Sequence, residues 1–277
     1  MAAPSLPTPD PTIPSTTIET ITPELAKAML ATNTSNRTLR DRVVSAYTRD
    51  IEAGRWKFTG EALKFADDGT LLDGQHRLAA IVKSGVALQM LVIRGLDRTA
   101  QEAMDTGAKR TTADALTLQG QKHGTLLSSV AKMILTDGER LTNLRPSNAE
   151  IIEIVRTDPS LRWVVGSALQ GDLHILRRLA SPSALGYAYW RLHAVDSFAT
   201  AEFFHRLATL EELPSGSPIL ALHRRLSTHE RRSDARKYRR EAIACFFMAW
   251  NAWRAGESRS IIKLAYSQGQ ISVPEPK

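Results

Sequence analysis

One stretch, Leu72-Asp73-Gly74-Gln75-His76-Arg77-Leu78-Ala79-Ala80, indicates the fold, because a strand pattern ends there at a glycine and passes directly into a helix pattern. The first turn of a helix presents backbone N–H groups that have no intrahelical acceptor, and the helix dipole adds partial positive charge there. Gly74 lets an anion approach the backbone closely, and Arg77 can donate two parallel hydrogen bonds to phosphate oxygens. His76 can donate a further hydrogen bond or transfer a proton near neutral pH. We therefore predict a phosphate site formed by Gly74, Gln75, His76 and Arg77. In the alternative, Asp73 caps the helix, His76 packs and Arg77 is a surface residue.

Around this stretch the pattern predicts alternating helices and strands. Helical spacing of apolar residues predicts helices over residues 22–31 and 38–54, and a further helix from 75 that ends near Gly85. Residues 62–65 and 70–72 read as a hairpin with a turn at Asp67-Asp68-Gly69, and 89–93 as an apolar strand. Two more helices, 99–104 and 112–118, flank the loop 105–110. These elements predict a small α/β domain over residues 18–118.

From about residue 123 onward the helical period dominates and strand patterns are almost absent. The expected helices cover 126–135, 148–156, 161–169, 184–193, 199–207, 219–226 and 234–255. The fold class is therefore α+β, with an all-α domain over residues 119–277. Residues 1–17 are rich in Pro, Ser and Thr and are expected to form a disordered leader.

Composition narrows the classes of partner. The net charge of +7 and a pI near 9.7 favour polyanions such as DNA. The apolar stretches fall short of the roughly 20 residues that cross a bilayer, so we expect no membrane span and a cytoplasmic protein. The single cysteine, Cys245, lies in an apolar run and is expected in the core.

The residues D-G-Q-H-R followed by L-A-A resemble the D-G-x-x-R-x-x-A box of ParB-like proteins, the G-C-H-R turn of sulfiredoxins and the D-G-H-H-R turn of free-serine kinases. Residues 21–26, 36–37, 54–56 and 105–111 also resemble boxes of ParB-like proteins from phages and mobile elements. The resemblance implies a ParB/sulfiredoxin-type domain. It also implies that the turn at residues 74–77 binds the phosphates of a nucleotide of the CTP or ATP type.

Departures from these families limit what can be carried over. Gln75 stands where sulfiredoxin has its reactive cysteine, which excludes sulfiredoxin chemistry. The E-N-x-Q-R segment of ParB corresponds to residues 104–110, which lack its glutamate and asparagine, and this argues against CTP hydrolysis of the ParB kind. Asp105 can still hold a magnesium ion, while Lys109 and Arg110 can reach phosphates and Arg37 can complete the site. Alternatively, 105–110 is a solvated loop and Asn36 only caps a helix.

Two more carboxylates are candidates for chemistry. Glu61 precedes the first hairpin strand and Asp73 precedes the glycine, so either can act as a general base beside a bound phosphate. Together with Asp105 they form the set of catalytic candidates. Helix capping and ordinary surface roles are the alternatives.

The second half contains a dense run of basic residues that we call the basic stretch. Its arginines are Arg224, Arg225, Arg231, Arg232, Arg236, Arg239 and Arg240. On a helix anchored by Ile243, Phe247 and Trp250, such a face can contact a DNA backbone. A solvated helix face is the alternative, and Trp250 with Trp253 is expected to pack in the core.

These patterns leave three hypotheses. The first is a nucleotide-responsive, DNA-binding ParB-like protein of phage or mobile-element type, with magnesium as a possible cofactor and a homodimer as a possible assembly. The second is an enzyme, such as an NTPase, kinase or nuclease, that uses the phosphate site for phosphoryl transfer or phosphodiester cleavage. The third is an interaction protein that has kept the fold without its ligand.

Overall fold

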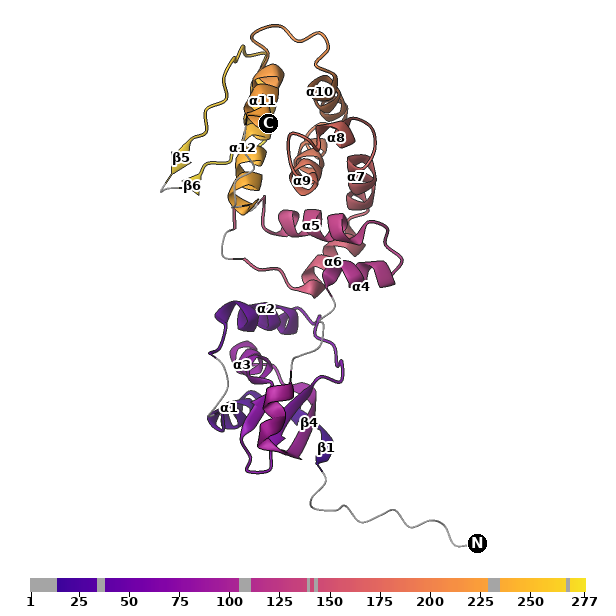
Figure 1. The fold of residues 1–277 in the computed structure, drawn as a ribbon. Coiled ribbons are helices and arrows are strands. Elements are labelled where there is room, and N and C mark those ends of the chain that lie inside the picture. Colours follow the sequence, from indigo (N-terminus) through magenta and orange to yellow (C-terminus); the bar gives the residue numbers. More distant parts are fainter. Residues whose placement is uncertain are drawn as a thin grey trace, which may run out of the picture. The chain divides into compact units, whose positions relative to one another are not determined.

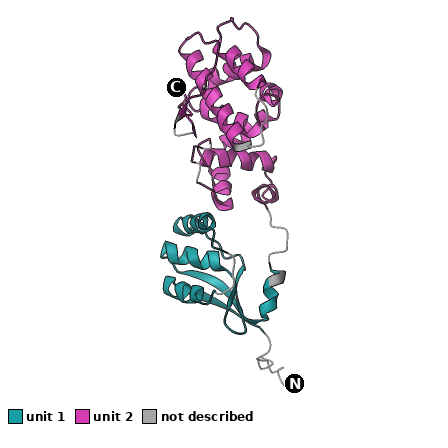
Figure 2. Ribbon diagram, turned by 60° about the vertical axis from the view of Figure 1, so that its left-hand side comes forward, with its two compact units in different colours: residues 1–109 teal, residues 110–277 magenta. Residues whose placement is uncertain are grey.

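The computed structural model describes residues 14–33, 38–104, 111–138, 140–141, 144–228, 235–267 and 270–277, with the side chains of 102, 103, 235, 236 and 267 excepted. The chain divides into two units, residues 1–109 and 110–277 (Figure 2). Helix α4 (Thr112–Leu118), which we expected in the first domain, belongs to the second unit. The reason is burial: Leu116 lies in a cluster with Leu127 and Val130 of the second unit.

The first unit is built on a four-stranded sheet with the strand order β1-β4-β2-β3. Its strands are β1 (Ser15–Ile21), β2 (Ala62–Ala66), β3 (Leu71–Asp73) and β4 (Leu88–Leu96). Strand β4 runs antiparallel to β1 and parallel to β2, while β2 and β3 form the predicted hairpin. Residues 15–17, which we expected in the leader, form the start of β1. Their backbone pairs with β4, and the β-branched Thr16 and Thr17 suit a strand.

Helices α1 (Pro23–Ala31), α2 (Asp41–Glu52) and α3 (Gln75–Ser84) complete this unit, and α3 lies between the other two (Figure 1). The predicted start of α1 is confirmed, since the Thr22 side chain accepts a hydrogen bond from the Leu25 N–H and Pro23 is the first helical residue. Strand and helix side chains share one core, including Leu63, Phe65 and Leu78. A short 3₁₀ helix, η1 (Arg98–Ala103), follows β4.

The second unit is helical, as expected. After α4 come α5 (Gly124–Leu135), α6 (Asn148–Thr157), α7 (Ser160–Ala168), α8 (Gly171–Leu176), α9 (Pro182–His193), α10 (Ser197–Thr209), α11 (Pro218–Ser227) and α12 (Ala235–Arg254). The expected capping box at Ser147 and Glu150 is present. Two elements were not predicted, α8 and the hairpin of β5 (Tyr266–Ser267) and β6 (Gln270–Ile271). Both are too short to show a period.

Helix α12 is the central element of the second unit's core. Phe246, Phe247 and Trp250 are fully buried, which confirms packing as the role of Trp250. Cys245 is buried beside them. In the part of the chain that the structure describes, no helix is both long and apolar enough to cross a membrane.

Burial makes Cys245 a reporter of opening in the helical unit. Desolvation raises the pKa of its thiol to about 11, partly offset by the neighbouring Arg225. The nucleophilic thiolate is therefore scarce at pH 8, and we expect no reaction with a chromogenic disulfide reagent until urea opens the unit. A fast, stoichiometric reaction in native buffer would contradict this burial.

Candidate functional site

The junction between β3 and α3 depends on a close backbone approach. Gly74 is the N-cap of α3 and has a φ of 110°, in the left-handed region that favours glycine. A Cβ at this position would lie 2.4 Å from Cδ2 of Leu63, a buried residue of β2. Glycine therefore allows β2 to pass beside the first turn of α3. We call residues 74–77 the α3 turn.

Arg77 is turned toward the sheet. Its Nη2 donates to the carbonyl oxygen of Ala62 at 2.9 Å and to Oδ2 of Asp73 at 3.2 Å, and its side chain is only 11% exposed. Its Nη1 is buried and has no hydrogen-bond partner among the described residues. Burying a charged donor without an acceptor costs free energy, so such a group calls for an acceptor that the chain itself does not provide.

The two residues between Gly74 and Arg77 hold neighbouring segments. The buried Gln75 accepts a hydrogen bond at its Oε1 from the Asn33 amide, at 3.1 Å. Nε2 of His76 accepts from the backbone N–H of Arg40 at 3.1 Å, just before α2 begins. In this arrangement Nε2 is used as an acceptor and does not donate to an anion. Both side chains thus link the α3 turn to the segments that flank residues 34–37.

Of the carboxylate candidates, Asp73 is engaged in ion pairs. It faces Lys64 directly across the β2–β3 hairpin, at 3.7 Å, in addition to Arg77. It does not cap α3, because Gly74 occupies that position. Glu61 is exposed, one residue before the carbonyl that Arg77 contacts. The antiparallel register places residues 61–63 beside the α3 turn, so both carboxylates lie at this end of the hairpin.

The remaining predicted site residues of this unit lie outside the described part of the chain. They are Arg37, Asp105, Lys109 and Arg110. Within the described residues, no group of three or more His, Cys, Asp or Glu side chains could hold a metal ion. The magnesium role of Asp105 stays a prediction.

The basic stretch is divided among different environments. Arg224 and Lys237 are exposed, while Arg225 lies beside the buried Cys245. Arg240 donates from Nε to the carbonyl oxygen of Ile271 at 3.1 Å and from Nη1 to Gln270 at 3.0 Å. Arg240 therefore holds the β6 strand, a role that the helical period did not indicate. Arg231, Arg232 and the Arg236 side chain are outside the described residues, and Arg239 is half-buried.

With this geometry in view, comparison with known proteins adds no relative: no family model, no curated protein and no solved structure matches the chain. The ParB/sulfiredoxin assignment stays a prediction from the residues.

Three contributors to the site were missed by sequence reasoning. Leu63 sets the need for glycine, Lys64 pairs with Asp73, and Asn33 holds Gln75. The hairpin register alone could have indicated the first two, because it places residues 63 and 64 beside 73 and 74. Asn33 reaches Gln75 only through tertiary packing.

The close approach at Gly74 predicts a difference between two glycines. Gly74→Ala introduces a left-handed alanine and a clash with Leu63, whereas Gly69→Ala introduces only the first cost, since φ is 82° and nothing lies within 4 Å. A left-handed alanine costs about 1–2 kcal/mol and an overpacked contact about 1–3 kcal/mol more. Hydrogen exchange of residues 62–84 by mass spectrometry should show much the larger loss of protection for Gly74→Ala. Equal losses would mean that the contact with Leu63 relaxes freely.

Proposed function

We propose that this chain is a nucleotide-responsive DNA-binding protein of the ParB-like kind that its residues resemble. In this proposal the α3 turn binds the phosphates of a CTP- or ATP-type nucleotide with magnesium. Exposed cations of the basic stretch contact the DNA backbone. The observation that carries the proposal is the buried Nη1 of Arg77, which has no acceptor among the described residues.

The position of that nitrogen supports an anionic ligand. Arg77 belongs to the first turn of α3, where the helix dipole favours negative charge. Its other terminal nitrogen is fixed by Ala62 and Asp73, so the guanidinium is held in one orientation before any ligand arrives. A phosphate oxygen would supply the acceptor that Nη1 lacks among the described residues.

The second part of the proposal is supported by charge. The chain has a net charge of +7, and Arg224 at the end of α11 and Lys237 at the start of α12 are exposed. Neutralising DNA phosphates releases counterions, which gives sequence-independent affinity. Arg240 is left out of this surface because the β6 strand occupies it.

The enzymatic alternative has less support. It needs a carboxylate poised to take a proton, and Asp73 already faces two cations while Glu61 is exposed. Phosphoryl transfer or phosphodiester cleavage therefore stays a prediction for which Asp105 is still a candidate.

Replacing Arg77 with Lys separates phosphate binding from structure. Lysine keeps a positive charge facing Asp73 but has no second terminal nitrogen, so stability should change little while nucleotide binding weakens. Loss of a charge-assisted hydrogen bond, about 1.5–3 kcal/mol, corresponds to roughly a 10- to 150-fold loss of affinity in calorimetric titrations with CTP, ATP and ADP plus magnesium.

The matched control is Arg98→Lys. Arg98 belongs to η1 and pairs at 2.9 Å with Asp68, in the turn between β2 and β3. This variant should bind nucleotide as the parent does. If the parent chain binds none of the nucleotides, or if Arg77→Lys binds as tightly as the parent, the phosphate role of the α3 turn is refuted.

The DNA part is tested by salt dependence. The double variant Arg224→Ala, Lys237→Ala removes two exposed cations, and each lost phosphate contact changes the slope of log affinity against log salt by about 0.9. The slope should flatten by up to about 1.8, with little change in sequence preference. The control pair Arg156→Ala, Arg206→Ala removes one exposed and one half-buried arginine, which pair with Glu153 and Glu202 elsewhere on the helical unit. Equal slopes for the two double variants would refute the assignment to the basic stretch.

A further inference from the structure

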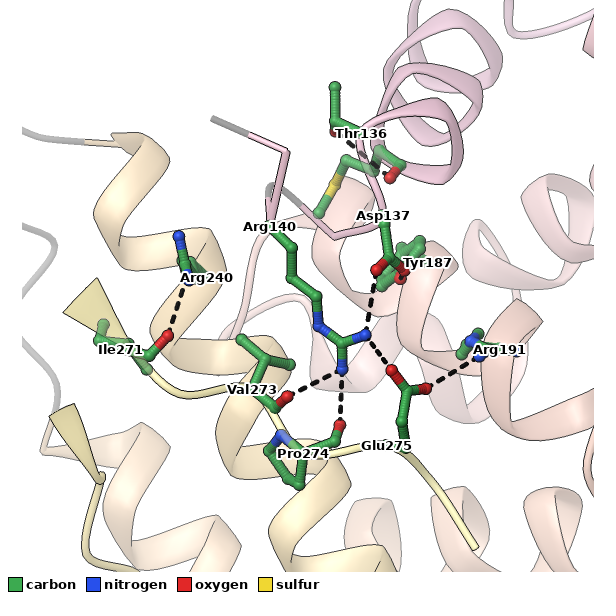
Figure 3. A network of polar contacts seen from close by, with 11 residues as sticks. Thr136, Asp137, Arg140, Tyr187, Arg191, Arg240, Ile271, Val273, Pro274 and Glu275 are labelled. Atoms are coloured by element: carbon green, nitrogen blue, oxygen red, sulfur yellow. Dashed lines mark hydrogen bonds and ion pairs between the residues drawn. The ribbon is translucent and has the colours of Figure 1, made fainter. Parts of the chain in front are cut away.

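The segment 270–277 contacts the helical unit through many of its main-chain carbonyl oxygens, several of which Figure 3 shows. After β6 it follows an extended path without helix. Side chains of the helical unit donate to its carbonyl oxygens at residues 271, 273, 274, 275 and 277, over 2.8 to 3.1 Å. The donors are Arg240, Arg140, Asn251 and Trp250. Hydrogen bonding to the main chain of an extended segment is one of the ways in which proteins bind peptides.

The side-chain amide of Asn251, in α12, makes the two hydrogen bonds to the segment that a neighbouring β-strand would make. Its Nδ2 donates to the carbonyl oxygen of Glu275 at 2.8 Å, and its Oδ1 accepts from the N–H of Lys277 at 2.9 Å. A residue in a parallel ladder makes the same pair of bonds, to a carbonyl and to an N–H two residues further on. The residue between them, Pro276, has no N–H to satisfy. One side-chain amide therefore satisfies this stretch of backbone.

The two prolines of the segment also favour binding as an extended peptide. Pro274 and Pro276 alternate with Glu275, and each fixes its own φ, so the segment loses little conformational freedom when it binds. Nε1 of Trp250 donates to the carbonyl oxygen of Lys277 at 2.8 Å.

Specificity comes from three side chains of the segment. Ile271 is buried and Val273 packs against the helical core. The carboxylate of Glu275 lies between two arginines, with an ion pair to Arg140 and another to Arg191 at 2.9 Å. The site thus selects an apolar residue, a second apolar residue two positions later, and an acidic residue two positions after that.

Arg140 is oriented before the segment arrives. Its Nη1 donates to Oδ2 of Asp137 at 3.0 Å, and the hydroxyl of the buried Tyr187 donates to Oδ1 of the same carboxylate at 3.0 Å (Figure 3). Asp137 and Gly138 both have a positive φ. A Cβ on residue 138 would lie 2.7 Å from the Tyr187 ring. These residues belong to the helical unit and not to the segment, so the binding side chains form a site of their own.

We propose that the helical unit carries a binding site for an extended peptide of the form Ile-x-Val-Pro-Glu-Pro, filled in cis by residues 270–277, and that the same segment of a second copy of this chain can occupy it. Exchange of an identical element is a low-cost route to a dimer, because every contact made in cis is available in trans. Two contacts anchor the chain before the part that would exchange. Ile262 is buried, and the backbone N–H of Arg259 donates to the Gly216 carbonyl oxygen at 2.7 Å. The part that would exchange therefore begins after residue 262.

The test weakens the binding of residues 270–277 to the helical unit and leaves the side chains of the binding site unchanged. A tethered segment competes at an effective concentration on the order of millimolar, so the parent chain should bind a labelled, end-capped peptide of residues 270–277 only weakly. Full-length Glu275→Ala loses both ion pairs of its own segment and should bind the peptide at least about 10-fold more tightly in fluorescence polarisation. A peptide carrying Glu275→Lys should not bind either chain. The matched control is Glu257→Ala, which removes an exposed acid that pairs with Arg259 away from the segment.

A second variant, Glu275→Ala with Val273→Ser, covers the case in which one change leaves the segment in place. Limited proteolysis after residue 265 reports release, and near-ultraviolet circular dichroism reports the fold. If the double variant fails to bind the peptide, the proposal is overturned. If it unfolds and added peptide does not restore it, the segment is an inseparable part of the core and the proposal is equally overturned.

Discussion

The passage of β2 beside the first turn of α3 is the contact on which the candidate site depends. Glycine suits position 74 because its φ is 110° and a Cβ there would lie 2.4 Å from Cδ2 of Leu63. That approach brings the Ala62 carbonyl within reach of Arg77 and sets Lys64 opposite Asp73. The hairpin and the helix thus form one substructure, and a displacement at Gly74 would move each of these groups.

In the proposed function, Arg77 serves both the fold and a ligand. Its Nη2 links strand β2 to the end of β3, which keeps the guanidinium in place. Its Nη1 remains buried without an acceptor among the described residues, which costs stability in the absence of a ligand. A loss of stability of this kind is expected when a side chain is fixed in its binding orientation before the ligand is present. The ligand then binds more tightly, because less binding free energy is spent on ordering that side chain.

The helical unit uses several of its arginines internally. Arg140, Arg191 and Arg240 all contact residues 270–275, so a basic composition does not translate into an equally basic surface. Among the described residues of the basic stretch, Arg224 and Lys237 are exposed, and they are the ones that the proposed function assigns to DNA contact. Part of the positive charge of the helical unit is thus taken up by contacts with an extended segment of the chain itself.

The sequence by itself determined the local elements of this protein. Thr22 with Pro23, Ser147 with Glu150 and the glycine before Gln75 begin helices through contacts within a few residues, so their patterns are legible without tertiary structure. Strand β1, helix α8 and the β5–β6 hairpin were missed, because they are stabilised by partners distant in sequence or are too short to show a period. Only the tertiary structure decided that Arg77 and Arg240 turn inward and that Asn251 binds a backbone. Those roles depend on which carbonyl oxygens the fold brings within about 3 Å, a property that spacing along the chain does not encode.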